Sequence, residues 1–102
     1  MDNRIFYSQL AADDLDETWN YIAKELCNES AANDIMNGIL KAIEILKKFP
    51  ESGAILKLPE DNISGYRFVK YGNYLAFYRT EGNTVYIDRV ICSRRDYLKF
   101  LF

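Results

Sequence analysis

The chain has 102 residues, which is enough for one domain with a buried core and too few for two. Hydrophobic residues make up 49% of the chain and aromatic residues 15%, a composition that excludes an intrinsically disordered protein. The formal net charge is −2, and the chain contains no histidine, so we expect neither the commonest zinc ligand nor the usual proton shuttle.

The net charge conceals an asymmetry between two parts of the chain. Residues 1–64 carry six basic and twelve acidic side chains, whereas residues 65–102 carry seven basic and three acidic ones. The first part therefore has a charge of −6 and the second a charge of +4. This division indicates an anionic partner for the C-terminal part, and ordinary solvated charges explain it equally well.

Nothing in the sequence points to a membrane, a metal or a cofactor. No apolar run approaches the roughly 20 residues that cross a bilayer, and the N-terminus lacks the basic-then-apolar pattern of a signal peptide. We therefore expect a cytoplasmic protein that uses no cofactor and no metal. Cys27 and Cys92 form no Cys-x-x-Cys pair, so we expect free and mostly buried thiols in that reducing compartment.

The first half of the chain predicts a strand and then a helical hairpin. Residues 1–8 are β-branched and aromatic near their end, which is typical of a strand. Residues 9–49 show helical periodicity on both sides of a break at Asn28–Ser30. The apolar stripes of the two helices are Leu15, Trp19, Ile22, Ala23 and Leu26, and then Ala32, Ile35, Met36, Ile39, Ile43 and Leu46. The polar face of the first helix carries Asp13, Asp14, Asp16, Glu17 and Lys24.

The second half predicts a sheet. Residues 50–64 contain two prolines and a glycine without a clear period and are predicted to form a loop. Residues 65–92 hold three β-rich runs joined by short turns at Gly72-Asn73 and Glu81–Asn83, the pattern of an antiparallel meander. Residues 93–102 are predicted to form a short C-terminal tail. The order β-α-α-β-β-β predicts one α+β domain, with the helical hairpin packed on one face of an antiparallel sheet and the other face left to water or a partner.

Short motifs run through the whole chain. They are Tyr7-Ser8, Ala12-Asp-Asp-Leu15, Tyr21-Ile22, Phe49-Pro50, Gly53, Tyr66-Arg67, Gly72-Asn-Tyr-Leu-Ala-Phe-Tyr78, Val85-Tyr-Ile-Asp-Arg-Val-Ile91 and Arg94-Arg-Asp-Tyr97. In this order, and in a chain of this length, they resemble the RelE/ParE superfamily of toxins from bacterial type II toxin–antitoxin pairs. The topology predicted from the residues agrees with that resemblance.

The resemblance implies a toxin that arrests growth and is neutralised by a cognate antitoxin protein, with which it forms a hetero-oligomer. RelE-like members are ribosome-dependent endoribonucleases that cut mRNA, and ParE-like members inhibit DNA gyrase. A third interpretation is a decayed toxin that survives as a binding partner or regulator.

Three positions bear on the choice between the branches. RelE-like toxins carry an arginine directly after the first tyrosine of the strand that here reads Tyr74–Tyr78, and this chain has Leu75 there. They also carry a catalytic tyrosine or a His-Tyr pair near the C-terminus, where this chain has the mostly apolar Leu98–Phe102. Arg95 does match a phosphate-binding arginine of that branch. We interpret the chain as closer to the ParE-like and plasmid-stabilisation branch.

The candidate site consists of residues at the strand ends. The gyrase interpretation assigns target binding to Arg67, Arg94, Arg95, Tyr97 and Lys99. The alternative, a metal-independent endoribonuclease, assigns catalysis to Arg67 and Arg95 on the phosphate, with Tyr97 as acid or base.

Some of the same side chains have structural interpretations. Arg67 is as well suited to pair with a helix carboxylate such as Asp16 as to bind a target. Arg89 lies among apolar residues of the last run, which predicts an internal ion pair. Trp19 and the phenylalanines are expected in the core.

Overall fold

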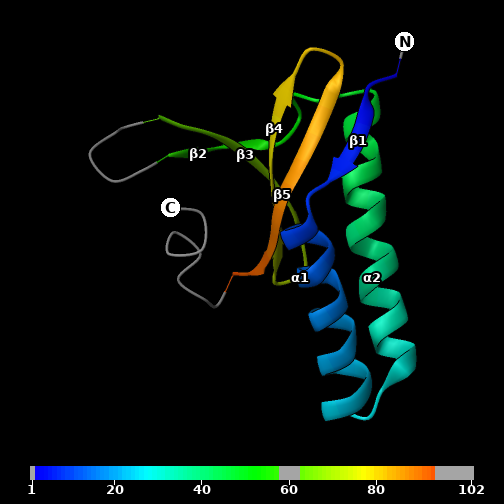
Figure 1. Cartoon of the computed structure of the whole chain (residues 1–102). Helices are drawn as coiled ribbons and strands as arrows, with labels where there is room; N and C mark the ends of the chain where they lie inside the picture. Colours follow the sequence, from blue (N-terminus) through cyan, green and yellow to red (C-terminus); the bar gives the residue numbers. More distant parts are fainter. Residues whose placement is uncertain (1, 58–62, 94–102) are drawn as a thin grey trace.

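The computed structural model describes residues 2–57 and 63–93 (Figure 1). In this part of the chain two α-helices and five strands follow one another in the order β1-α1-α2-β2-β3-β4-β5. The strands are β1 (Arg4–Tyr7), β2 (Ala54–Lys57), β3 (Ile63–Tyr71), β4 (Tyr74–Glu81) and β5 (Thr84–Cys92). The helices are α1 (Gln9–Asn20) and α2 (Glu29–Glu44), followed by a π-helical turn (Tyr21–Glu25) and a 3₁₀ turn (Ile45–Lys47), respectively.

Both helices begin at caps that the sequence supplies. The Ser8 hydroxyl accepts a hydrogen bond of 3.0 Å from the Ala11 N–H at the start of α1. At the start of α2 the Asn28 side-chain oxygen accepts one of 2.9 Å from the Ala31 N–H. Each cap satisfies a backbone donor that the first helical turn leaves without a partner. Within the described residues, no helix has the length and apolar character needed to cross a lipid bilayer.

The π-helical turn interrupts the apolar stripe predicted for the first helix. The Leu26 N–H donates to the carbonyl of Tyr21, five residues earlier, which widens the helical repeat by one residue. Leu26 is consequently 58% exposed, whereas periodicity placed it on the buried stripe. The next residue, Cys27, has a φ of 51° and is exposed, so the expectation of a buried thiol was wrong there. Cys27 and Cys92 are both free.

The strands form one sheet in the order β1-β5-β4-β3-β2. The hairpins β3–β4 and β4–β5 turn at Gly72 and Gly82, each with a φ of 58°, a conformation that glycine adopts without strain. β1 runs parallel to β5, with Arg4–Tyr7 registered on Thr84–Ile87. The predicted α+β fold, a helical hairpin on a sheet, is confirmed. The sheet is mixed because β1 and β5 are joined by the whole intervening chain, so no tight turn forces them antiparallel.

β2 lies inside residues 50–64, for which the sequence predicted a loop. Ala54 is opposite Phe68 of β3, and Lys57 is opposite Ile63 after an irregularity in the register. A four-residue strand that follows a turn is too short to show a period, and its pairing depends on β3. Sequence periodicity therefore could not reveal it.

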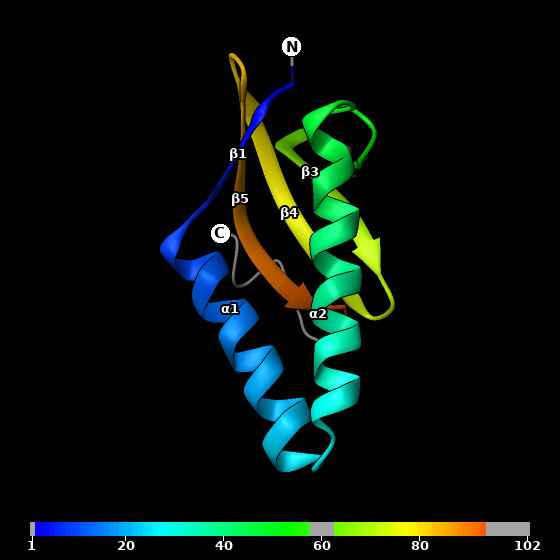
Figure 2. The ribbon, with the colours of Figure 1, turned by 90° about the vertical axis from the view of Figure 1, so that its right-hand side faces the viewer.

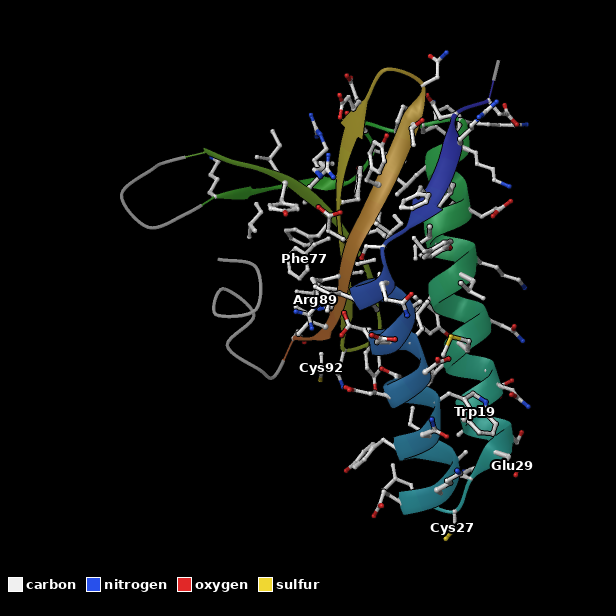
Figure 3. All side chains as sticks on the ribbon, in the orientation of Figure 1. Trp19, Cys27, Glu29, Phe77, Arg89 and Cys92 are labelled. Atoms are coloured by element: carbon white, nitrogen blue, oxygen red, sulfur yellow. The ribbon has the colours of Figure 1, made fainter. Side chains whose placement is uncertain are left out.

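The two helices lie on the same side of the sheet (Figure 2). Between them and the sheet is the main core, which contains Ala11, Ile39, Ile43, Leu46, Ala76, Tyr78, Val85, Ile87 and Val90. The opposite face carries a second buried cluster of Leu56, Leu75, Phe77 and Ile91, and Figure 3 shows Phe77 on the side away from α2. Burial of a large apolar side chain contributes about 1.5–3 kcal/mol, so both faces of the sheet contribute to stability.

The aromatic residues divide between the core and the surface. Phe77 is fully buried, whereas Phe6 and Phe49 are 57% and 62% exposed, so the expectation that the phenylalanines form the core holds only in part. Trp19 packs against the cluster around Ile22, and its indole N–H donates to Asn33 at 2.9 Å.

Candidate functional site

The predicted site residues fall into two groups. Arg67 lies on β3 within the described part of the chain, and Arg94, Arg95, Tyr97 and Lys99 lie outside the described residues.

Arg67 supports the turn that follows α2. Its Nη1 donates hydrogen bonds to the carbonyl oxygens of Glu51 (3.2 Å) and Gly53 (3.0 Å). No ion pair joins Arg67 to Asp16, both of which are described residues. The structural role of this arginine is therefore to donate hydrogen bonds to backbone carbonyls. No carboxylate of α1 pairs with its guanidinium among the described residues.

Tyr78 of β4 holds the same turn from the core side. Its hydroxyl donates to the Pro50 carbonyl at 2.8 Å and accepts from the Gly53 N–H at 3.0 Å. A Cβ added at Gly53 would lie 2.4 Å from that hydroxyl and 2.8 Å from the Phe68 carbonyl oxygen, so glycine alone fits. Burial raises the pKa of the Tyr78 phenol, which keeps it protonated as a donor.

Asp14 of α1 and Arg89 of β5 form a buried ion pair. Arg89 Nε lies 2.8 Å from Asp14 Oδ2, and Arg89 Nη2 lies 2.8 Å from Asp14 Oδ1. The two side chains are only 10% and 17% exposed, and the hydrogen bond to Asp14 raises the pKa of Arg89. The internal ion pair predicted for Arg89 is confirmed.

Asp14 also accepts a hydrogen bond from the backbone of β5 beyond the point where β1 stops pairing with it. Ser8 continues the pairing, because its N–H donates to the Ile87 carbonyl (3.0 Å) and its hydroxyl to the Asp88 carbonyl (2.8 Å). Further along, Asp14 Oδ2 accepts the Val90 N–H at 2.9 Å. Helical periodicity assigned Asp14 to the solvent-facing side, so sequence reasoning missed this role.

A hollow of about 880 Å³ lies beside the ion pair, between the helical hairpin and the C-terminal end of β5, where Figure 3 shows Arg89 and Cys92. Its lining also includes the exposed Tyr21 and Leu26 of the π-helical turn. Ser93 N–H donates to the Asn73 carbonyl at 2.6 Å, so the described chain ends next to this hollow.

Arg79 lies on the face of the sheet away from the helices. Its Nε lies 2.9 Å from Asp88 Oδ2, and Nη1 lies 3.7 Å from Glu81 Oε2. The guanidinium also stacks over the Tyr86 ring at 4.6 Å, and the Phe6 ring meets Tyr86 edge-on at 5.8 Å. The hydrogen bond to Asp88 raises the pKa of Arg79, whose side chain is 46% exposed.

These contacts limit the cationic surface that the described residues provide. Arg79 and Arg89 are each matched by carboxylates, and Arg67 is bonded to backbone carbonyls. Arg4 is exposed and lies beside Thr84, at the start of β5, whereas Ser93 follows the last residue of that strand. An open cationic face over the meander, as the sequence suggested, is not formed by the arginines of residues 2–57 and 63–93.

Two further observations concern the chemistry available. Leu75 is 6% exposed within the cluster on the outer face, so an apolar side chain is buried where the resemblance places an arginine in RelE-like toxins. Among the described residues, no three histidine, cysteine, aspartate or glutamate side chains gather as ligands for a metal ion.

Comparison with known proteins agrees with the fold. A family model described as the ParE toxin of the type II toxin–antitoxin system parDE matches residues 5–97. No curated protein matches the sequence. A structure from the chromosomal ParDE toxin–antitoxin system of P. aeruginosa superposes with a TM-score of 0.70 and 21% identity, over 88% of this chain and 95% of that one.

A second similar structure comes from the toxin–antitoxin complex RelBE2 of Mycobacterium tuberculosis. It superposes with a TM-score of 0.64 and 20% identity, over 90% of this chain and 99% of that chain. At such identities the two structures establish a shared fold.

Proposed function

The chain belongs to the ParE toxin family of type II toxin–antitoxin systems, and we propose that it arrests bacterial growth by binding DNA gyrase in the cytoplasm. The observation that carries the choice of target is the burial of Leu75. At this position the resemblance places an arginine in RelE-like toxins, and here the leucine side chain packs with Phe77 and Ile91. A phosphate that approached that cluster would lose its hydration to apolar groups, which is unfavourable because they provide no compensating charge or hydrogen bond.

We assign the gyrase contact to Arg67, Arg94, Arg95, Tyr97 and Lys99. Arg89 is buried against Asp14 and Arg79 is paired with Asp88, so neither guanidinium is free of a carboxylate. Residues 94–102 carry three basic side chains and one acidic side chain, and they follow directly on Ser93. A cationic, aromatic segment of this kind suits an anionic protein surface.

We also propose that a cognate antitoxin neutralises the protein in a hetero-oligomer. The support is that both similar structures come from toxin–antitoxin systems. Residues 1–64 carry a charge of −6 and residues 65–102 a charge of +4, so a charged antitoxin would be attracted mainly to one of the two parts of the chain.

Pulse labelling in cells tests the choice of target. Induction of the protein without an antitoxin should stop thymidine incorporation before leucine incorporation, because gyrase inhibition blocks replication first. The doubly substituted Arg94→Glu/Arg95→Glu protein should leave both rates near those of uninduced cells. A fall of leucine incorporation first, with cuts in the ribosomal A-site codon by toe-printing, would establish the nuclease instead. Unchanged growth would indicate a decayed toxin.

A further inference from the structure

β1 is an outermost strand of the sheet, with β5 as its neighbour on one side (Figure 1). The Arg4 N–H donates to the Asn83 carbonyl at 2.8 Å and the Ser8 N–H to the Ile87 carbonyl at 3.0 Å, so alternate residues of the chain are directed at β5. In the other positions are Ile5 and Tyr7, whose backbone N–H and C=O groups point away from β5. We call these groups the open edge of β1.

At its N-terminal end this edge meets the turn after α2. The Asn3 N–H donates to the Lys47 carbonyl at 2.8 Å, which satisfies the outward donor that precedes Ile5. Beyond that hydrogen bond the edge borders a hollow of about 580 Å³, whose lining includes Ile5, Tyr7, Glu44 and Lys47. In the described part of the chain no strand pairs with β1 on this side. An uncovered edge of this kind can pair with a strand of another chain.

The open edge is short, and its length selects the occupant. The hydrogen bond of Asn3 limits it at one end, and the start of α1 limits it at the other. A long peptide strand would extend past both limits, whereas a second copy of β1 brings a strand of equal length. In an antiparallel arrangement centred on Phe6, Ile5 of each copy faces Tyr7 of the other. Both outward-directed residues of each copy are then hydrogen bonded.

The exposed aromatic side chain of β1 suits this symmetric arrangement. Phe6 is 57% exposed, and the Tyr86 ring meets it edge-on from β5. Pairing centred on Phe6 places the two phenylalanine side chains opposite each other in a non-hydrogen-bonded pair, where side chains approach most closely. Burial of two exposed aromatic rings favours association.

The charges beside the edge are balanced, which favours a copy of the same surface over a strongly charged partner. Asp2, Arg4, Glu44 and Lys47 all line the hollow, and Glu44 is paired with Lys47 at 2.6 Å. A segment with many charges of one sign would meet a like charge here, which is unfavourable. In the two-fold arrangement Arg4 of each copy faces Ser8 of the other, so the two arginines do not oppose each other.

We propose that the protein forms a two-fold symmetric homodimer through the open edges of β1, with Phe6 at the axis. The two five-stranded sheets then join into one continuous sheet. Because a contact of this size belongs to weak and reversible complexes, we expect a monomer–dimer equilibrium. β1 contains none of the residues assigned to gyrase, so the proposal is independent of the target.

Cysteine cross-linking tests the register. In a Cys27→Ser background, which removes the exposed thiol, Phe6→Cys should form a disulfide-linked dimer under mild oxidation. The Cα atoms of two facing residues in a non-hydrogen-bonded pair are about 4.5 Å apart, within reach of a disulfide. Arg4→Cys, two positions earlier in the same strand, is the matched control. Its two copies would be about 14 Å apart, so we expect at least tenfold less covalent dimer.

Analytical ultracentrifugation of the full chain tests association without a cross-link. The wild type should sediment as a monomer–dimer equilibrium. Phe6→Glu should weaken dimerisation at least tenfold, because two carboxylates would face each other across the axis. Leu26→Glu changes an equally exposed apolar side chain at the end of the π-helical turn and should dimerise like the wild type. Circular dichroism checks that each variant is folded.

Three results would overturn the proposal. The first is a wild-type chain that remains monomeric up to about 1 mM. The second is equal cross-linking of Phe6→Cys and Arg4→Cys, which would contradict the register. The third is equal dimerisation of folded Phe6→Glu and the wild type, which would place the contact elsewhere. Because association is the only quantity measured, none of these results depends on inhibition of gyrase.

Discussion

Asp14 on α1 and Arg89 on β5 are 75 residues apart in the sequence and meet through two hydrogen bonds of 2.8 Å. The same carboxylate accepts the Val90 N–H, so one side chain neutralises a buried cation and closes the strand edge that β1 leaves open. This junction fixes the helical hairpin against the end of β5, immediately before the C-terminal segment to which most of the proposed target contacts belong.

Replacement of Asp14 by alanine should lower the free energy of unfolding by about 3–5 kcal/mol, because a buried guanidinium and a backbone N–H both lose their acceptor. Chemical denaturation followed by circular dichroism measures the change. Asp16→Ala removes an exposed acid from the same helix and should cost no more than about 0.5 kcal/mol. Equal losses for the two variants would show that the ion pair contributes nothing specific.

The turn after α2 should not tolerate a side chain at Gly53. Gly53→Ala brings a methyl group against the Tyr78 hydroxyl and the Phe68 carbonyl, and Tyr78 is fully buried and unable to move aside. We expect a loss of about 1–3 kcal/mol in the free energy of unfolding. Ala54→Gly in the neighbouring strand is the control. Gly65→Ala is unsuitable because the φ of Gly65 is 86°, a backbone conformation that alanine adopts only with strain. Wild-type stability for Gly53→Ala would contradict the packing described.

Stability should fall at alkaline pH. Burial raises the pKa of Tyr7, Tyr66 and Tyr78 above the ordinary value of 10.0. As the pH rises, these phenols ionise in the unfolded chain before they ionise in the folded one. Their contribution to the free energy of unfolding is therefore complete below about pH 10 and is lost as the pH rises further.

Urea unfolding at pH 7, 9 and 10.5 tests whether the free energy of unfolding falls as the pH rises. The free energy of unfolding should fall more steeply between pH 9 and 10.5 for the wild type than for Tyr78→Phe, which lacks one of the shifted groups. The Tyr78→Phe protein should also be less stable at pH 7 by about 1–3 kcal/mol, because the Gly53 N–H loses its acceptor. A steeper alkaline slope for the variant would contradict the assignment.

Two substitutions of Arg67 distinguish its structural role from a role in target binding. Arg67→Ala removes two hydrogen bonds to carbonyls and should cost about 1–3 kcal/mol of stability. Arg67→Lys keeps the charge and loses the forked geometry. If the charge contacts gyrase, the lysine variant should inhibit supercoiling more strongly than the alanine variant at equal folded concentration. Equal inhibition by both would limit Arg67 to its structural role.

Local patterns predicted much of this fold. The two helical stripes and the turns at Gly72 and Gly82 each have a local physical signal, and the structure contains them apart from Leu26 at the end of the first stripe. β2 and the parallel pairing of β1 have no local signal in the sequence, because each depends on the strand with which it pairs, β3 and β5 respectively. The exposure of Leu26 follows from a π-helical turn that a 3.6-residue period does not describe.

The site was less predictable than the fold. The ion pair of Arg89 follows from a cation among apolar neighbours, but its partner could not be chosen among the four acids of α1 from spacing alone. Tyr78 and Gly53 act together across 25 residues, and no local pattern links them. For Arg94, Arg95, Tyr97 and Lys99 the assignment as target contacts remains a prediction.

The most direct test is inhibition of purified gyrase. Supercoiling of relaxed plasmid should fall with increasing wild-type protein, and Arg94→Glu/Arg95→Glu should require at least tenfold more protein for the same effect. Asp13→Lys, an exposed change on α1, controls for altered charge and should inhibit like the wild type. Full gyrase activity at saturating wild-type protein, or equal inhibition by the doubly substituted protein, would contradict the proposed mechanism.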